Sequence, residues 1–451
     1  MTQAMPNLAP LAAGSRALVL GLGRTGLSCA RYLRARRLEV RVADTRAAPP
    51  GLDALREQVP DAELHTGPFT PALLDGVAQV VISPGLALAE PVAVEAQRRG
   101  LPVVGDVELF AREAQAPVAA ITGTNGKSTV TALLAELASA AGRAAVAGGN
   151  LGEPALDLLE RPLPQLYVLE LSSFQLETTH SLRTAVATVL NVTPDHLDRY
   201  GTLDDYAAAK ARIFDGCEVA VVNADDERVR AMPRPGQRVI TFSLQDPSAD
   251  YCLGREPEPA LVCRGEALLP VSAMRLQGEH NAANALAALA MCEALGLRRA
   301  PVLEALASFG GLPHRAQWVA DLDGVRFVND SKGTNVGATI AAVSGMAGPL
   351  VLIAGGEGKN QDFDELRPAC QGKVRHLVLI GRDAPRLEAT FAGVCTTERA
   401  TDMRAAVRAA RAAARPGDTV LLSPACASLD MFRDYAHRGE EFAAAVRSLA
   451  G

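Results

Sequence analysis

The chain has 451 residues and a formal net charge of −6, and 48% of its residues are hydrophobic. These values are ordinary for a globular protein with more than one domain, and the acidic balance gives no reason to expect bulk attraction to nucleic acid. The N-terminus lacks the charged start of a signal peptide, no apolar stretch is long enough to span a membrane, and the eight cysteines lack metal-type pairing. We therefore expect a cytoplasmic protein with reduced thiols.

The first predicted elements form a Rossmann-like unit. A strand at residues 16–20 runs into Gly21-Leu-Gly-Arg-Thr-Gly26, a helix-like segment follows at 27–37, and a second strand ends at Asp44. This pattern is the dinucleotide-binding fingerprint, and by itself it indicates NAD. The more general prediction is a nucleotide diphosphate held at a helix N-terminus. A third strand ends at Ser83-Pro-Gly85, which is either a ligand-side loop or a simple turn.

A second unit begins near Gly105 and contains the strongest motif in the chain. An apolar strand at 117–121 runs into Gly123-Thr-Asn-Gly-Lys-Ser-Thr129, and a helical run follows at 131–141. A strand, a glycine turn, Lys-Ser and a helix together wrap backbone N–H groups around phosphates, with the lysine on the outer phosphates and the hydroxyl on Mg²⁺. Ile121 stands where the full Walker pattern has glycine, so the loop is a shortened variant. The alternative is an ordinary glycine turn.

Two side chains beyond this loop are candidate site residues, and a lysine follows them on the next helix. Glu170 ends an apolar strand, and we interpret it as a metal ligand or water-positioning group; the alternative is a paired structural glutamate. His196 lies between two aspartates in the loop after strand 186–190, which favours a site over a structural histidine. Lys210 lies on the helix that follows, at 203–213.

The rest of the second unit is less informative. Residues 225–270 contain short β-type pieces, for which we expect an antiparallel elaboration. Asn281 and Asn284 stand at the start of the next helix, where two amides one turn apart either read a base edge or cap the helix.

A third unit begins near Gly311. The segment Leu312-Pro-His-Arg315 precedes a strand at 325–329 that ends in Asp330-Ser-Lys332. Further strands are predicted at 350–354, 376–380 and 419–422, and the loops at 355–359 and 423–430 either lie at the ligand-binding edge of a parallel sheet or are plain turns. The chain is therefore predicted to be an α/β protein of three domains: N-terminal Rossmann-like (1–105), central P-loop mononucleotide-binding with a parallel sheet (106–311) and C-terminal Rossmann-like (312–451).

Lysine is unusually scarce. It occurs five times among 45 basic residues, at positions 127, 210, 332, 359 and 373, and four of these fall inside the motifs. A lysine retained in so arginine-rich a chain is a candidate for chemistry that arginine cannot supply, such as a compact point charge or a reactive amine. The alternative for any one of them is chance placement.

Seven motifs in fixed order resemble the Mur ligases over nearly the full chain. They are Gly123–Thr129, Glu170–Gln175, Asn191–Tyr200, Gly278–Asn284, Leu312–Arg315, Asp330–Lys332 and Ser423–Ser428. Within that family the match is closest to the ligases that add D-glutamate to UDP-N-acetylmuramoyl-L-alanine in bacterial peptidoglycan synthesis. The resemblance implies that the three domains bind the UDP-sugar, ATP and the amino acid, in that order.

The resemblance also implies a reaction and its cofactors. The γ-phosphoryl group of ATP passes to the terminal carboxylate of UDP-MurNAc-L-alanine, the glutamate amine attacks the resulting acyl phosphate, and phosphate leaves. Two Mg²⁺ ions are expected, and Lys210 matches the position where the family has a carbamylated lysine. The partners are small molecules, without nucleic acid or membrane insertion, and the chain is expected to be a monomer.

The site residues that the resemblance implies form five overlapping sets. The ATP set is Gly123, Thr124, Asn125, Gly126, Lys127, Ser128, Thr129, Asn281, Asn284, Arg315 and Asp330. The UDP-sugar set is Arg24, Thr25, Asp44, Thr45, Arg46, Ser83 and Asn150, and the glutamate set is Thr334, Lys359, Ser428 and Leu429. The metal ligands are Ser128, Glu170, His196 and carbamylated Lys210, and the catalytic set is Lys127, Asn150, His196, Lys210, Arg315 and Lys332.

Three positions depart from the usual family pattern: Glu357 replaces Asp, Gly333 replaces Ala and Tyr435 replaces Phe. All three belong to the amino-acid pocket, so the preference between D- and L-glutamate stays open. The competing hypotheses are a Mur-type or folylpolyglutamate-synthetase-like ligase for another amino acid, an NAD-dependent oxidoreductase and a non-catalytic nucleotide-binding protein.

Overall fold

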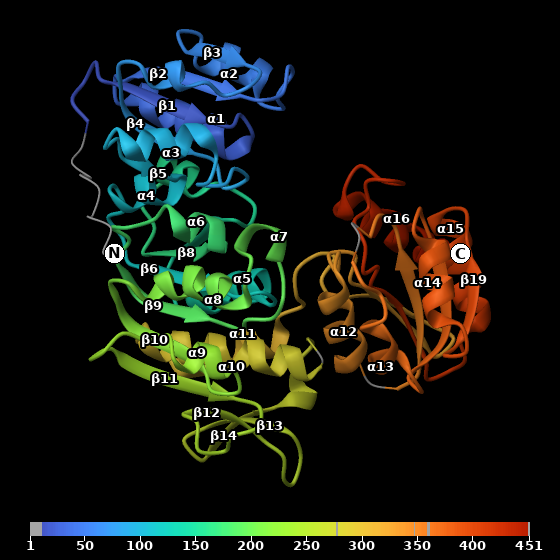
Figure 1. Cartoon of the computed structure of the whole chain (residues 1–451). Coiled ribbons are helices and arrows are strands. Elements are labelled where there is room, and N and C mark those ends of the chain that lie inside the picture. The colour runs from blue at the N-terminus through green and yellow to red at the C-terminus, as the bar shows by residue number, and fades with distance from the viewer. Residues whose placement is uncertain (1–10, 277, 347, 359–360, 450–451) are drawn as a thin grey trace. The chain divides into compact units, whose positions relative to one another are not determined.

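The computed structural model describes residues 11–276, 278–346, 348–358 and 361–449 (Figure 1). The chain divides into two compact units, Met1–Tyr251 with Ala287–Val302, and Cys252–Leu286 with Leu303–Gly451, and each is described by itself. Helices alternate with strands that are mostly parallel, as the sequence predicts for an α/β protein. No described helix is long and apolar enough to cross a membrane.

The first sheet has the order β3-β2-β1-β4-β5, and all of its pairs are parallel. Its strands are β1 (Arg16–Leu20), β2 (Glu39–Asp44), β3 (Glu63–Thr66), β4 (Val77–Ile82) and β5 (Val103–Val104); the helices are α1 (Arg24–Ala35), α2 (Leu52–Gln58), η1 (Pro71–Leu74), α3 (Pro91–Arg98) and α4 (Asp106–Ala111). The chain leaves β1 in one direction and returns at β4 on its other side. The carboxyl ends of β1 and β4 therefore form a switch point, where open α/β sheets bind ligands.

Helix α1 begins three residues earlier than the sequence predicts, directly at the glycine turn. A Cβ added at Gly26 would lie 1.9 Å from the carbonyl oxygen of Gly21, so the third glycine of the motif allows helix α1 to approach strand β1. A Cβ at Gly23 would meet no atom within 4 Å. The two positions of one loop thus differ in whether they tolerate a side chain.

The second sheet places its phosphate loop on a central strand. Within the first unit its order is β11-β10-β9-β6-β8-β7, again with parallel pairs. Its strands are β6 (Val118–Thr122), β7 (Ala145–Gly149), β8 (Leu166–Glu170), β9 (Thr184–Val189), β10 (Cys217–Asn223) and β11 (Arg238–Ser243). Because β6 lies between β8 and β9, the residues that end those strands lie on either side of the loop.

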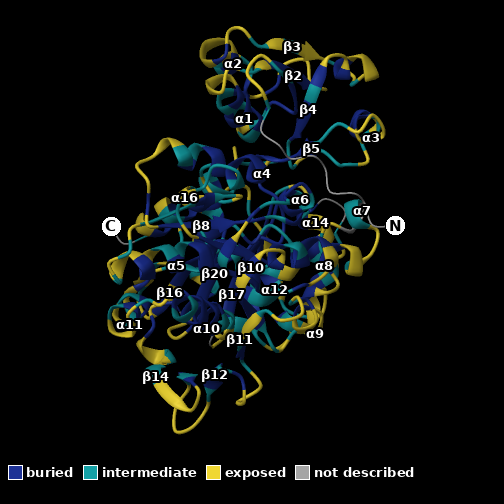
Figure 2. Ribbon diagram, turned by 90° about the vertical axis from the view of Figure 1, so that its left-hand side faces the viewer, coloured by how far each residue is buried: buried dark blue, intermediate teal, exposed yellow. Residues whose placement is uncertain are grey.

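The helices of this region are short, apart from the one that follows the phosphate loop. They are α5 (Lys127–Ala140), η2 (Ala155–Glu160), α6 (Ser173–Glu177), α7 (Leu197–Tyr200), α8 (Leu203–Ala211), η3 (Arg212–Phe214) and α9 (Glu227–Arg230). Strand β6 is buried at all five positions, as its run of apolar residues predicts. Figure 2 shows the strands mostly dark blue and the outer loops yellow, so the sheets form the cores.

The segment at residues 225–270 is only partly the antiparallel elaboration that the sequence suggests. Strand β11 pairs with β10 in parallel, so the expectation is wrong for that strand. Strands β13 (Ala260–Cys263) and β14 (Glu266–Pro270) are antiparallel, as expected. Strand β12 (Tyr251–Gly254) also lies in this segment, and η4 (Val271–Ala273), α10 (Glu279–Ala294) and α11 (Arg299–Ser308) follow it in the chain.

The third sheet has the order β15-β16-β20-β17-β18-β19. Its strands are β15 (Gln317–Leu322), β16 (Val325–Asn329), β17 (Leu350–Gly355), β18 (Val374–Ile380), β19 (Thr396–Arg399) and β20 (Thr419–Leu422); the helices are α12 (Val336–Gly345), α13 (Leu366–Cys370), α14 (Ala384–Phe391), α15 (Met403–Ala413) and α16 (Tyr435–Arg447). Only β15 pairs antiparallel, at an edge. Because β20 lies between β16 and β17, the polar loops after these three strands meet at one sheet edge.

The close approach at Gly26 gives a stability prediction. We expect Gly26→Ala to lower the free energy of unfolding by about 1–3 kcal/mol, because the added methyl group forces helix α1 away from strand β1. Urea unfolding followed by circular dichroism measures the effect. Gly23→Ala is the matched control, and we expect it to stay within about 0.5 kcal/mol of wild type. Equal losses in the two variants would contradict the packing argument.

Candidate active site

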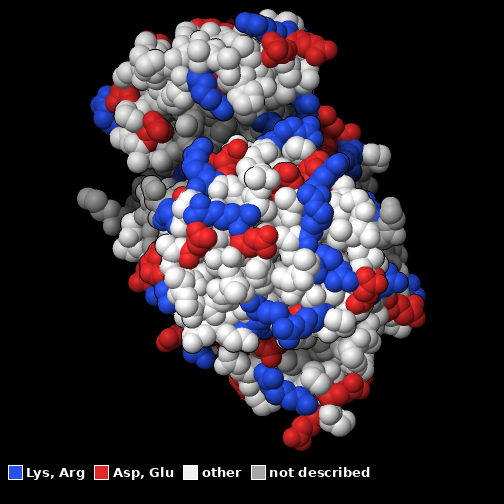
Figure 3. All heavy atoms as spheres, turned by 90° about the vertical axis from the view of Figure 1, so that its right-hand side faces the viewer, with Lys and Arg blue, Asp and Glu red and all other residues white. Residues whose placement is uncertain are grey.

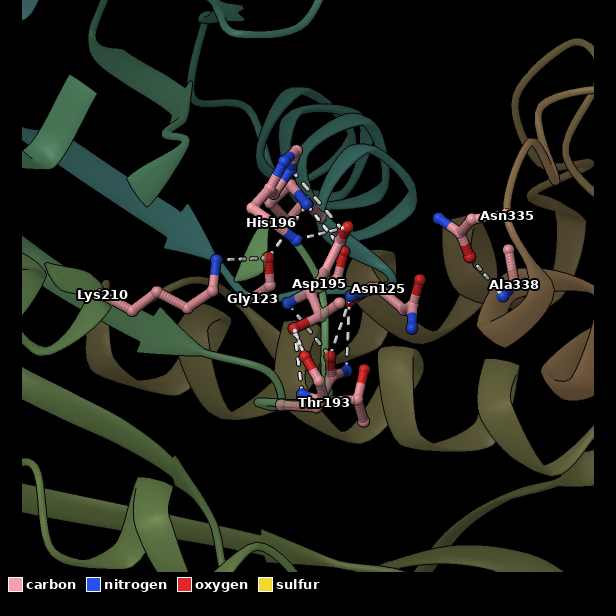
Figure 4. A network of polar contacts seen from close by, with 11 residues as sticks. Gly123, Asn125, Thr193, Asp195, His196, Lys210, Asn335 and Ala338 are labelled. Carbon is pink, nitrogen blue, oxygen red and sulfur yellow. Dashed lines mark hydrogen bonds and ion pairs between the residues drawn. The ribbon is translucent and has the colours of Figure 1, made fainter. Parts of the chain in front are cut away.

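The phosphate loop is held in shape by contacts to the segment after strand β9. The Asn191 side-chain oxygen accepts the backbone N–H groups of Thr124 (3.1 Å) and Asn125 (2.8 Å), and its amide donates to the Asn125 carbonyl (3.1 Å). Thr124 and Thr193 exchange a further pair of hydrogen bonds, between side-chain hydroxyl and backbone groups. Figure 4 shows Asn125 and Thr193 of this network close to Gly123. Two stretches nearly 70 residues apart therefore form one rigid loop.

Two lysines converge on one carbonyl of this loop. The Lys127 ammonium donates to the carbonyls of Gly123 (2.9 Å) and Thr124 (2.8 Å), and the Lys210 amine donates to the same Gly123 oxygen (2.8 Å). Lys210 is only 1% exposed, and its nitrogen lies 4.3 Å from the centre of the Tyr206 ring. Burial, followed by the charge of Lys127, holds the pKa of Lys210 well below its usual value, and Asp195 and Glu170 oppose the shift. Burial therefore makes the neutral form of the Lys210 amine easier to reach than in water.

Glu170 is the point where three of the predicted site residues meet. The Ser128 hydroxyl donates to one carboxylate oxygen (2.5 Å), and the Asn150 amide donates to the other (2.7 Å). Glu170 is 2% exposed and lies beside Ile121 in the register of strands β6 and β8. A buried carboxylate next to a loop hydroxyl is a set of hard oxygen donors of the kind Mg²⁺ prefers.

His196 lies in the same segment as Asn191 but has a different environment. Its backbone is in the left-handed region (φ 53°), its ring nitrogen lies 3.6 Å from the Asp195 carboxylate, and its ring packs edge-on against Phe174 at 4.8 Å. The described residues contain no group of three or more His, Cys, Asp or Glu side chains that could hold a metal ion by themselves.

A cavity of about 510 Å³ opens at the switch point of the first sheet. Its wall includes all seven residues of the predicted UDP-sugar set, namely Arg24, Thr25, Asp44, Thr45, Arg46, Ser83 and Asn150. Asn150 is shared, since it lines the cavity and also donates to Glu170. The cavity and the phosphate loop are thus adjacent parts of one site.

Asp44 organises the cavity wall. Its carboxylate accepts the Leu22 backbone N–H (2.7 Å) and three N–H groups of Arg46 at 2.7–2.9 Å. The Arg46 hydrogen bond is the largest cause that lowers the pKa of Asp44 to about 2. Asp44 therefore fixes the glycine turn and holds the Arg46 guanidinium in place. The cavity lining also includes Pro84 and Gln175, which belong to segments that the sequence singled out, and Phe69, which it did not suggest.

The second unit brings the Arg315 segment and the Asp330 loop together. The Asp330 carboxylate accepts the Ala316 backbone N–H (3.1 Å) and the Ser423 hydroxyl (2.8 Å), and Lys332 donates its backbone N–H to the His314 carbonyl (3.0 Å). Burial raises the pKa of Asp330 to about 6, against the effects of the Ser423 hydrogen bond and of Arg315. The Lys332 nitrogen lies 3.8 Å from the centre of the Tyr435 ring.

An arginine that the sequence did not suggest anchors this edge. Arg438 in helix α16 is fully buried and donates to the Ser331 carbonyl (2.8 Å), the Ser331 hydroxyl (3.0 Å) and the Cys426 carbonyl (3.1 Å). It therefore joins the loops after β16 and β20.

The remaining predicted residues of this unit have varied environments. Ser428 is buried and Leu429 is 64% exposed, and Thr334 donates its backbone N–H to the Lys332 carbonyl (2.8 Å). Asn281 and Asn284 are buried in the first two turns of helix α10, where Asn284 donates to Asn281 (3.2 Å). Lys359 lies outside the described residues.

Comparison with known proteins assigns the family. The Mur ligase MurD-like N-terminal domain matches residues 15–105, the Mur ligase middle domain matches 121–292, and the Mur ligase glutamate ligase domain matches 314–426. A relative from Nitrosococcus oceani is 53% identical over 436 residues, which cover 96% of each chain. The chain belongs to the Mur ligase family.

Further relatives support the same assignment. A Methylococcus capsulatus protein is 53% identical over 97% of this chain and 95% of its own, and both relatives carry the name UDP-N-acetylmuramoylalanine–D-glutamate ligase. Among solved structures, the UDP-N-acetylmuramate-alanine ligase MurC of Thermotoga maritima has a TM-score of 0.61 at 18% identity, covering 96% of this chain and 99% of its own. MurF of Acinetobacter baumannii has a TM-score of 0.59 at 18% identity, covering 98% of this chain and 93% of its own. These structures show the Mur ligase fold.

The comparisons confirm the resemblance drawn from the seven motifs and the three-domain α/β fold class. The roles of individual residues and the limits of the three domains stay predictions. The sequence did not predict that Asn191 and Thr193 hold the phosphate loop in shape. Both residues follow strand β9, which pairs with strand β6 of the phosphate loop. On the face drawn in Figure 3, basic and acidic side chains are interspersed.

The environment of Asp330 makes the stability of this Mur ligase pH-dependent. Because the folded pKa of about 6 lies above the usual value of 3.8, the fold gains stability as pH falls through 6, and the gain is complete below 3.8. From pH 7 to pH 5 we expect about 1 kcal/mol from this group. The measurement is urea unfolding of wild type and Asp330→Asn at both pH values. The free energy of unfolding of wild type, relative to that of Asp330→Asn, should be higher at pH 5 than at pH 7. An equal difference between the two proteins at both pH values would contradict the argument.

Proposed function

We propose that this chain is the ATP-dependent ligase that adds D-glutamate to UDP-N-acetylmuramoyl-L-alanine in peptidoglycan precursor synthesis. Full-length identity of 53% to relatives with that name supports the substrates. The observation that carries the proposal is the position of Asn150, which lines the cavity and also donates to Glu170 beside the phosphate loop. A UDP-linked substrate in the cavity would present its far end to the phosphates of ATP.

The first chemical step brings a substrate carboxylate to the γ-phosphate, so it sets two anions against each other. A carboxylate oxygen forms a bond to the γ-phosphorus while the bond to ADP breaks. In this proposal Lys127 and the loop N–H groups hold the phosphates, and Asn150 orients the reacting carboxylate. Arg315 would contact the γ-phosphate and Lys332 the acyl centre. The glutamate amine then attacks the acyl carbon, and inorganic phosphate leaves.

The residues around Glu170 fit Mg²⁺. Ser128 and Glu170 would hold one ion, and Glu170 would also serve a second ion with His196 and a carbamylated Lys210. Bound Mg²⁺ would neutralise the charge that develops on the phosphoryl oxygens. Carbamylation needs a neutral amine, because the nitrogen lone pair attacks the carbon of CO₂ and the nitrogen then loses a proton. The lowered pKa of the buried Lys210 amine meets that requirement.

The other assignments complete the proposal. Asp330 would contact the ribose, and Asn281 and Asn284 the adenine. The glutamate carboxylates would bind at Thr334, Lys359, Ser428 and Leu429, and the UDP moiety at the seven cavity residues. The three domains would end near residues 105, 311 and 451. We further propose that the enzyme acts as a monomer in the cytoplasm, where ATP and UDP-linked precursors are found.

The function is tested by phosphate release. Purified protein is incubated with ATP, Mg²⁺ and UDP-MurNAc-L-alanine, and D-glutamate, L-glutamate or meso-diaminopimelate is added separately. We expect D-glutamate alone to stimulate release by about tenfold or more over the reaction without an amino acid. Stimulation by diaminopimelate only would assign another Mur ligase activity. No stimulation by any of the three would refute the proposal.

Lys210 provides a test of the carbamate. We expect Lys210→Arg to keep the fold and lose about 100-fold or more in kcat, because a guanidinium cannot add CO₂ and leaves a cation where an anion is needed. Lys373→Arg is the matched control, since Lys373 donates to the Ser344 carbonyl and lies in no predicted site. A second readout is independent of turnover: ¹³C NMR with labelled bicarbonate should show a carbamate resonance that Lys210→Arg lacks. A fully active Lys210→Arg would exclude the role.

A further inference from the structure

Arg199 joins two parts of the site that come from different sheets. It lies in helix α7, three residues after His196, and its side chain is 15% exposed. One guanidinium nitrogen donates to the Pro84 carbonyl (3.0 Å), and another donates to the Glu177 carboxylate (2.7 Å). The guanidinium carbon lies 4.0 Å from the centre of the Phe174 ring. One side chain therefore bridges two acceptors on separate elements.

The first end of this bridge is the wall of the UDP-sugar cavity. Pro84 stands between Ser83 and Gly85, and all three line the cavity. The Ser83 hydroxyl donates to the Gly21 carbonyl (3.1 Å), so the wall is tied to the glycine turn of the first sheet. Movement of Pro84 would therefore change the shape of the cavity.

The other end of the bridge is the segment that contains His196. The His196 carbonyl accepts the backbone N–H groups of Arg199 (3.0 Å) and Tyr200 (3.2 Å). The Phe174 ring, beneath the Arg199 guanidinium, packs against both the His196 ring (4.8 Å) and the Tyr200 ring (5.8 Å). Movement of Arg199 would therefore be transmitted to His196, whose surroundings Figure 4 shows.

We propose that Arg199 is a positioning residue that couples the UDP-sugar cavity to the phosphate side of the site. With substrate in the cavity, the Ser83–Gly85 wall is fixed, and the bridge fixes the His196 segment in the arrangement that ATP requires. Binding of the two substrates then becomes mutually favourable, because each pays part of the cost of ordering the same segment. The inference rests on the proposed function of this site.

The bridge depends on the shape of arginine more than on its charge. Separate nitrogens of one planar group reach Pro84 and Glu177, whereas the single nitrogen of a lysine cannot reach both from the same backbone position. Arg199→Lys therefore keeps the charge and loses the bridge. Glu177→Gln keeps the bridge and loses the charge, because the oxygen of the glutamine amide still accepts a hydrogen bond from Arg199.

A third variant controls for general loosening of the junction between the first two sheets. Glu113 accepts hydrogen bonds from Tyr32 and Arg36, which lie in helix α1 and directly after it, so it joins the same two regions. It lies neither in the cavity wall nor in the His196 segment. Glu113→Gln weakens the junction at a distance from the bridge.

The experiment measures the affinity for a non-hydrolysable ATP analogue by calorimetry, with Mg²⁺, in the presence and absence of UDP-MurNAc-L-alanine. In wild type we expect the UDP substrate to raise this affinity about fivefold or more. In Arg199→Lys the ratio should fall below about twofold and the KM for the UDP substrate should rise about tenfold. Glu177→Gln and Glu113→Gln should keep the wild-type ratio within about twofold.

Several outcomes would overturn the inference. The first is a ratio of ATP-analogue affinities, with and without the UDP substrate, that is near one in wild type or unchanged in Arg199→Lys. The second is a fall of this ratio in Glu177→Gln equal to that in Arg199→Lys, which would assign the effect to charge. An equal loss in Glu113→Gln would assign it to the junction as a whole. Failure of the proposed function is separate, since wild type would then show no phosphate release stimulated by an amino acid. Thermal unfolding of each variant confirms that the comparison is made on folded protein.

Discussion

The buried carboxylate of Glu170 is the constraint on which the first unit depends. A charge with 2% exposure is costly unless every oxygen is paired, and here the Ser128 hydroxyl and the Asn150 amide supply one partner each. Those two partners come from the phosphate loop and from the loop after strand β7, so satisfying one carboxylate fixes two loops. The position of strand β8 next to β6 makes this arrangement possible. In the proposed function this carboxylate would hold Mg²⁺ close to the phosphates of ATP.

The lysines around this centre show how burial changes the chemistry of a residue. Lys127 and Lys210 donate to the same Gly123 carbonyl, but only Lys210 is enclosed by the α8 region and the Tyr206 ring. Two ammonium groups so close together repel each other, and the buried one is more easily neutralised. Scarcity of lysine drew attention to both residues. Their different environments follow from exposure, which depends on the packing of elements far apart in the chain.

Hydrogen bonds of individual side chains connect the cavity wall with the phosphate loop and the segment beside it. Asn150 lines the cavity and donates to Glu170, which also accepts from Ser128 of the phosphate loop. Arg199 ties the Pro84 wall to the segment containing His196. Asp44 keeps the opposite wall in place by accepting hydrogen bonds from Leu22 and Arg46. In the second unit Arg438 has a comparable effect, because it fixes two loops that end neighbouring strands. The partly buried Arg199 and the buried Arg438 both donate to backbone carbonyls, which any residue could supply, so these acceptors leave no mark in the sequence.

The sequence by itself determined the three α/β units, the phosphate loop, the Gly21–Gly26 turn and the family. The units, the loop and the turn are encoded by local patterns, in which a strand, a turn and a helix follow one another within about 25 residues. The family follows from seven motifs in a fixed order along nearly the full chain. It was wrong about the direction of strand β11 and the start of helix α1, because short apolar segments do not specify their pairing partners. Only the tertiary structure decided that Asn191 shapes the phosphate loop, that Lys210 is buried and that Arg199 reaches Pro84. Those contacts join residues about 65 to 115 positions apart, and they follow from the order of strands in the sheets, which no local pattern records.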